Sequence, residues 1–94
     1  MMTDILDELF STILERKVDL PEGSYTAHLF TSGEDEILKK VGEEAMEVIL
    51  AGKGQSDERL ISEVADLLYH LLVLLASRDV TLDDVRAELE RRHR

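Results

Sequence analysis

Hydrophobic residues recur along this chain every three or four positions, which is the spacing of amphipathic helices. Four such stretches are present, at residues 3–18, 34–51, 57–78 and from 81 towards the C-terminus. No stretch alternates with the two-residue period of a half-buried strand. The sequence therefore predicts an all-α protein built from four helices.

Capping and helix-breaking residues separate these stretches. Thr3 can cap the first helix, and Pro21, the single proline, ends it. Residues 24–31 show no clear period and are interpreted as a loop or a short helical turn. The glycines of Gly52-Lys53-Gly54 are expected to stop the second helix. Thr81 begins a capping-box pattern at the start of the last helix.

The third helix has an unusually wide apolar arc. Its members are Leu60, Ile61, Val64, Leu67, Leu68, Leu71, Leu72, Leu74 and Leu75. So wide an arc implies burial on more than one side of the helix. Residues 1–94 are expected to form a single domain, and a homodimer is the simplest way for so short a chain to cover this surface.

Composition excludes several functional classes. The chain is 44% hydrophobic and 34% charged, so it is neither disordered nor membrane-spanning by composition. Its longest apolar run, residues 71–76, is far shorter than a membrane helix needs. A net charge of −10 argues against nonspecific nucleic-acid binding. Cysteine is absent and the N-terminus has acids where a signal peptide is apolar, so a cytoplasmic location is expected.

Two pairs of carboxylates stand out within the helical stretches. Glu44 and Glu47 are three residues apart, and so are Glu63 and Asp66. Residues at this spacing share one helix face with Cβ atoms roughly 5–6 Å apart. Like charges about 5 Å apart repel by roughly 3 kcal/mol at an effective dielectric constant near 20. The pairs therefore favour a divalent cation with oxygen ligands, Mg²⁺ or Mn²⁺, although acids on solvated helix edges are the simpler alternative.

Other polar residues near these pairs have an ordinary and a functional interpretation. Lys40 can form a surface ion pair or contact phosphate beside the metal. His70 fits a buried histidine better than a ligand of Mg²⁺, which prefers oxygen. Tyr25 can be a packing residue or contact a nucleotide. Arg92 suits the C-terminus of a helix but could also hold phosphate.

At this point the residues resemble a known family. Residues 39–47, Lys-Lys-Val-Gly-Glu-Glu-Ala-Met-Glu, followed by residues 63–70, Glu-Val-Ala-Asp-Leu-Leu-Tyr-His, are similar to the motif of the all-α MazG-like nucleoside triphosphate pyrophosphatases. The Ser-Tyr-Thr segment at 24–26, the Tyr-His-Leu-Leu-Val-Leu-Leu segment at 69–75 and the ending at 88–93 resemble more closely the phosphoribosyl-ATP pyrophosphatase family of histidine biosynthesis.

The resemblance implies a MazG-like bundle completed by homodimerisation. It also implies Mg²⁺-dependent hydrolysis of N1-(5-phosphoribosyl)-ATP to N1-(5-phosphoribosyl)-AMP and pyrophosphate, the second step of L-histidine biosynthesis. The expected metal ligands are Glu44, Glu47, Glu63 and Asp66, with Mn²⁺ as a possible substitute for Mg²⁺.

The expected chemistry follows from the residues as well. Cleaving a phosphoanhydride requires neutralised phosphoryl oxygens and an activated water. Glu47 is the candidate base for that water. The expected substrate-binding residues are Lys39, Lys40, Tyr25 and Arg92.

Two other functions are consistent with the sequence. The same chemistry would serve a house-cleaning pyrophosphatase for noncanonical nucleotides. A non-catalytic helical dimerisation module would need no metal, and its carboxylates would simply be solvated.

Overall fold

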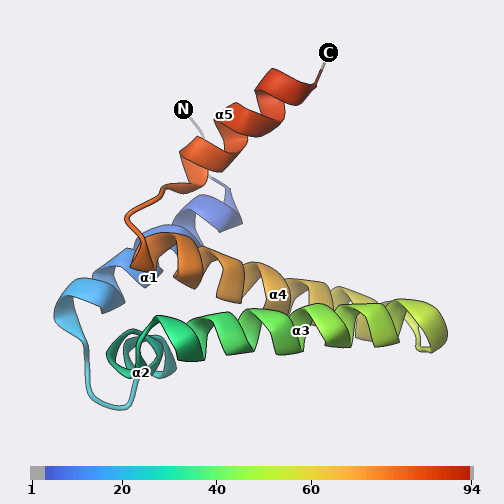
Figure 1. The fold of residues 1–94 in the computed structure, drawn as a ribbon, viewed down its shortest axis with the longest axis horizontal. Coiled ribbons are helices and arrows are strands. Elements are labelled where there is room, and N and C mark those ends of the chain that lie inside the picture. The colour runs from blue at the N-terminus through green and yellow to red at the C-terminus, as the bar shows by residue number, and fades with distance from the viewer. Residues whose placement is uncertain (1–3, 94) are drawn as a thin grey trace.

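The computed structural model describes residues 4–93, which form five α-helices and no strand (Figure 1). The helices are α1 (Ile5–Asp19), α2 (Tyr25–Ser32), α3 (Glu34–Gly54), α4 (Asp57–Ser77) and α5 (Leu82–Arg92). The predicted all-α class is confirmed. Thr3, the expected cap of the first helix, lies outside the described residues. Asp4 caps α1, and its side chain accepts a hydrogen bond from the Asp7 N–H at 3.0 Å.

The additional helix is α2, where a loop or a short helical turn was expected. The Ser24 hydroxyl caps it by accepting a hydrogen bond from the Ala27 N–H at 3.1 Å. Ala27 and Leu29 are buried, so tertiary packing fixes a segment that is too short to show a clear period. Gly33 then joins α2 to α3 with a φ of 99°, which favours glycine.

The two longest helices, α3 and α4, lie side by side as a hairpin (Figure 1). The expected stop at residues 52–54 is wrong in detail, because α3 continues through both glycines to Gly54. Only Gln55 and Ser56 separate the two helices, and the Ser56 hydroxyl caps α4 by accepting from the Arg59 N–H. So short a connection places equivalent stretches of α3 and α4 next to each other.

The hydrophobic core occupies one end of this hairpin. There α1 and α2 pack near the start of α3 and the end of α4 (Figure 1). The buried residues of this core are Phe10, Ile13, Leu29, Ile37, Leu72, Val73 and Ala76. The other end of the hairpin extends beyond α1 and α2, so the middle of the hairpin lies where the core gives way to solvent.

Helix α5 stands apart from the rest of the chain and points away from the hairpin (Figure 1). None of its residues is buried. Its Arg86 guanidinium binds the carboxylates of Asp4 and Asp7 at the start of α1. Leu82 packs against the core. Because of these contacts, α5 is attached to the bundle at its first turns only.

A large apolar surface stays exposed on α3 and α4. Ile61, Val64 and Leu68 share one face of α4, and Ile49 is 60% exposed on α3. Within residues 4–93, α4 alone is long and apolar enough to cross a membrane by length and composition, a test that core helices of soluble proteins also pass. The wide apolar arc predicted from the sequence is therefore only partly covered by this chain.

Candidate metal centre

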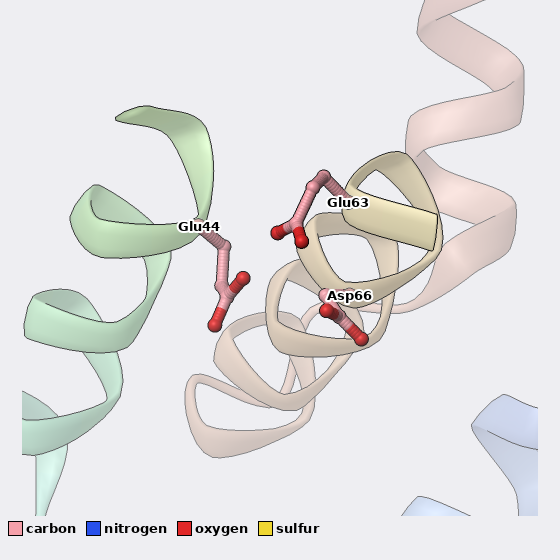
Figure 2. A group of neighbouring side chains, drawn as sticks. All are labelled: Glu44, Glu63 and Asp66. Carbon is pink, nitrogen blue, oxygen red and sulfur yellow. The ribbon is translucent and has the colours of Figure 1, made fainter. Parts of the chain in front are cut away.

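Three of the four predicted carboxylates come together in the middle of the hairpin. Glu44 projects from α3 toward Glu63 and Asp66, which lie one turn apart on α4 (Figure 2). One carboxylate oxygen from each residue lies within 4.8 Å of the other two. We call Glu44, Glu63 and Asp66 the carboxylate cluster. It joins two segments nearly twenty positions apart in the sequence, which the short α3–α4 connection makes possible.

The three members differ in their exposure. Glu63 is only 4% exposed, Glu44 is half-buried and Asp66 is exposed. A guanidinium nitrogen of Arg59 lies 3.0 Å from a carboxylate oxygen of Glu63. Burying a carboxylate is costly unless it is paired, so this ion pair accounts for the position of Glu63. Sequence analysis missed Arg59, although its position four residues before Glu63 on a helix was a usable signal.

The electrostatics of the cluster favour a cation. Burial raises the pKa of Glu44 above its ordinary value of 4.5, and the charge of Asp66 raises this pKa further. Two oxygens on opposite sides of a Mg²⁺ ion lie about 4.2 Å apart. The cluster is therefore only slightly wider than a magnesium coordination sphere, and its three oxygen donors are of the type that Mg²⁺ and Mn²⁺ prefer.

The cluster faces an open cavity of about 870 Å³ between α3 and α4. Glu47, the fourth predicted ligand, lines this cavity but does not belong to the group of three. Lys39, a predicted substrate-binding residue, also lines it. The full lining consists of Lys39, Gly42, Glu43, Glu44, Met46, Glu47, Arg59, Ser62, Glu63 and Asp66. A cavity of this size, with charged walls, suits a polar ligand rather than an apolar one.

A hydrogen-bonded pair, Tyr25 and His70, lies beside the cluster. His70 is 6% exposed, and its Nδ1 is 2.8 Å from the backbone oxygen of Asp66. A carbonyl oxygen only accepts, so Nδ1 carries the proton, and in the neutral ring Nε2 accepts from the Tyr25 hydroxyl at 3.0 Å. His70 is thus a buried histidine, as expected, and it links α4 to α2.

The three other predicted substrate-binding residues, Tyr25, Lys40 and Arg92, lie outside the cavity lining. The Lys40 ammonium is 3.5 Å from a carboxylate oxygen of Glu43, and the nearby Tyr25 and Glu43 raise its pKa. The Arg92 guanidinium is 2.8 Å from Glu88 on α5, the helix that points away from the hairpin (Figure 1). Roles for Lys40, Tyr25 and Arg92 in substrate binding therefore stay predictions.

An all-α fold with acidic residues gathered between two antiparallel helices defines a class of helical proteins with a candidate site for a divalent cation. Within that class, the chain belongs to the phosphoribosyl-ATP pyrophosphohydrolase family, whose family model matches residues 6–93. The match covers nearly the whole chain, including every predicted site residue. The chain is therefore an enzyme of the hydrolase class.

Individual relatives are similar to this chain over almost its full length. A phosphoribosyl-ATP pyrophosphatase of Trichlorobacter lovleyi is 62% identical over 88 residues, covering 94% of this chain and 82% of the relative. One from Metallosphaera sedula is 54% identical over 91 residues, covering 97% of this chain and 98% of the relative. A histidine biosynthesis bifunctional protein of Bacillus subtilis is 56% identical over 89 residues, which are 95% of this chain and 43% of that protein.

Proposed function

We propose that this protein hydrolyses the α–β phosphoanhydride of N1-(5-phosphoribosyl)-ATP, giving N1-(5-phosphoribosyl)-AMP and pyrophosphate, in the second step of L-histidine biosynthesis. Membership of the family and the identity to relatives named for this activity support the substrate. The carboxylate cluster supports the type of chemistry. The single observation on which the mechanism depends is that Glu44, Glu63 and Asp66 converge within 4.8 Å.

We propose that Mg²⁺, or Mn²⁺ in its place, is held by the cluster, with Glu47 as a further ligand from the cavity wall. When bound, the cation would neutralise charge on the phosphoryl oxygens and make an attacking water more acidic. The cluster fits this role because its ligands are oxygens of nearly the right separation. The raised pKa of Glu44 also shows that the protein disfavours the charged form of this carboxylate, which a bound cation would stabilise.

The protein's own side chains have distinct tasks in this proposal. Glu47 is proposed to accept a proton from the attacking water, and its position on the cavity wall outside the group of three supports this role. Lys39 offers positive charge to the phosphates from the cavity wall. Lys40 and Tyr25 lie close enough to influence each other's pKa and would contact the more distant parts of the nucleotide.

We also propose that a second copy of the chain covers the exposed apolar surface. This surface includes Met46, Ile49 and Leu50 on α3 and Ile61, Val64 and Leu68 on α4. Exposed apolar area on two adjacent long helices is typical of a homodimer interface. Ile49→Glu would introduce a charge into this interface, and sedimentation should then show a monomer where the wild-type protein is a dimer.

We place the protein in the cytoplasm, with neither nucleic acid nor membrane as a partner, because its substrate is a small, charged nucleotide.

The deciding experiment measures pyrophosphate release from N1-(5-phosphoribosyl)-ATP with and without Mg²⁺, alongside dATP, dCTP and dUTP. We expect fast, Mg²⁺-dependent release from N1-(5-phosphoribosyl)-ATP and slow release from the deoxynucleotides. Release from deoxynucleotides alone would keep the chemistry and change the substrate to noncanonical nucleotides. Release from none of them would favour a non-catalytic helical module.

A further inference from the structure

Arg59 is a cation in the candidate site that the proposed mechanism does not use. It lies in the first turn of α4, and its guanidinium is 3.0 Å from the buried carboxylate of Glu63. The two side chains differ sharply in exposure, 54% for Arg59 and 6% for Glu63. Arg59 therefore reaches from solvent into the cavity to contact the least accessible member of the cluster.

Helix stability does not explain this residue. A cation near the N-terminus of a helix opposes the helix dipole, and the first turn of α4 otherwise has Asp57 and Glu58, as the dipole favours. An arginine four residues before a glutamate is also the less favourable order for an ion pair on a helix. The contact is better explained by the need of Glu63 for a positive partner.

A divalent cation at the cluster would compete with that partner. Both would bind the carboxylate of Glu63, so their positive charges would lie close together and repel each other. The long, half-exposed side chain of Arg59 can turn away without disturbing the core. A released guanidinium would stay on the wall of the same cavity.

The cavity also needs positive charge for an anionic ligand. Its described lining has five carboxylates against two cations, Lys39 and Arg59. A guanidinium can donate two parallel hydrogen bonds to a phosphate, which a lysine ammonium cannot do with the same geometry. Once a divalent cation has taken over Glu63, Arg59 is the residue on the wall best suited to bind phosphate.

We propose that Arg59 is a displaceable counter-ion, which neutralises Glu63 until a divalent cation binds and then binds the pyrophosphate portion of a nucleoside triphosphate. This inference rests on the proposed function and adds to it a residue that changes partners during binding. It predicts that one substitution of Arg59 changes the affinities for the cation and for the nucleotide in opposite directions. Removing the guanidinium should strengthen binding of the cation and weaken binding of the nucleotide.

The test compares Arg59→Gln with Arg78→Gln. Arg78 lies at the other end of α4, where it pairs with Glu34 at 2.9 Å, and it does not line the cavity. The dissociation constant of Mn²⁺ for the free protein is measured by electron paramagnetic resonance, and kcat and KM are measured at saturating Mg²⁺. For Arg59→Gln we expect tighter Mn²⁺ binding by several-fold and a roughly tenfold higher KM, the cost of one charge-assisted hydrogen bond. Arg78→Gln should match the wild-type protein.

Arg59→Lys provides the second variant, because it keeps the charge and loses the paired donors. It should bind Mn²⁺ like the wild-type protein and recover only part of the lost substrate affinity. Unchanged or weaker Mn²⁺ binding by Arg59→Gln would overturn the counter-ion role, and an unchanged KM would overturn the phosphate contact.

The result for the wild-type protein separates this inference from the proposed function. Turnover without measurable Mn²⁺ binding to the free protein would overturn the counter-ion and leave the proposed function standing. Mn²⁺ binding that Arg59→Gln strengthens, without turnover of N1-(5-phosphoribosyl)-ATP, would support the counter-ion and overturn the proposed substrate.

Discussion

The two halves of α4 are built in opposite ways. Residues 69–77 include Leu72, Val73 and Ala76, which are buried in the core against three other helices. Residues 57–66 have two members of the carboxylate cluster and an exposed apolar face. The N-terminal half of α4, residues 57–66, is therefore charged and open to solvent, and the C-terminal half, residues 69–77, is packed in the core. Packing of the C-terminal half of α4 in the core stabilises the helix, and this keeps the like charges of the N-terminal half close together.

Substituting a member of the cluster should produce the largest effect of all. Asp66→Asn keeps the shape of the side chain and removes its charge, so we expect kcat/KM to fall about a hundredfold or more, as when one stabilising group is lost at a transition state. Steady-state pyrophosphate release measures this change. Asp57→Asn, on the same half of α4 but outside the cavity, is the control. A wild-type rate for Asp66→Asn would show that the cluster is not the catalytic site.

A core substitution should instead reduce stability and leave the site chemistry intact. Leu29 is fully buried, so Leu29→Ala should lower the free energy of unfolding by about 2–5 kcal/mol. Urea denaturation measures this loss, and KM of the remaining folded protein should not change. Leu14→Ala, at a position 41% exposed, should cost much less. Equal losses for the two variants would contradict the location of the core.

Mg²⁺ should stabilise the open half of α4. At a hundredfold excess over its dissociation constant, a bound cation adds about 2.7 kcal/mol to the free energy of unfolding. Glu44→Gln should lose this gain and, in the presence of a chelator, melt above the wild-type protein, because a repelled carboxylate is removed. Glu43→Gln, which breaks only the pair with Lys40, should keep the gain. A melting temperature that responds to Mg²⁺ no more than to KCl at equal ionic strength would argue against a site in the free protein.

The boundary between the halves can be tested with two matched tyrosines. Tyr25 donates to His70, whereas the hydroxyl of Tyr69 is hydrogen-bonded to Thr26. Tyr25→Phe and Tyr69→Phe should each cost about 1 kcal/mol of stability. Only Tyr25→Phe should raise the KM for the nucleotide, because Tyr25 is 47% exposed beside Lys40. Equal KM values for both variants would remove Tyr25 from the predicted substrate contacts.

The smallest effect is the change of stability with pH, and its sign differs between Glu44 in the carboxylate cluster and Asp7 at the start of α1. The pKa of Glu44 is raised in the folded protein, mainly by burial, so its contribution to stability is lost as pH rises through that pKa. The pKa of Asp7 is lowered, mainly by its bond to Arg86, so its contribution is lost as pH falls below the ordinary value of 3.8. Melting temperatures measured against pH, with chelator present, test both signs. Glu44→Gln should remove the loss of stability that Glu44 causes as pH rises, and Asp7→Asn should remove the loss that Asp7 causes as pH falls.

The sequence predicted the elements that depend on a long periodic pattern. The apolar period of α3 and α4 and the three-residue spacing of the acids indicated that two pairs of carboxylates, Glu44 with Glu47 and Glu63 with Asp66, belong together. The structure brings three of these four residues into one group and leaves Glu47 outside it. The period failed for α2, because two turns are too short for a pattern and burial of Leu29 decides their structure. Arg59 was missed because its position four residues before Glu63 indicates a possible ion pair, but not that Glu63 is buried and needs a partner.

The clamp between Arg86 and the start of α1 has a consequence for the order of folding. The bond from Arg86 to Asp7 spans 79 positions, whereas α3 and α4 pair through a connection of two residues. Local contacts form early, and contacts between distant positions form late. During synthesis, the hairpin with the carboxylate cluster can therefore assemble while α1 still lacks its final partner. The start of α1 gains its Arg86 partner only after α5 has been synthesised, whereas the rest of α1 can already pack against α2 and α4.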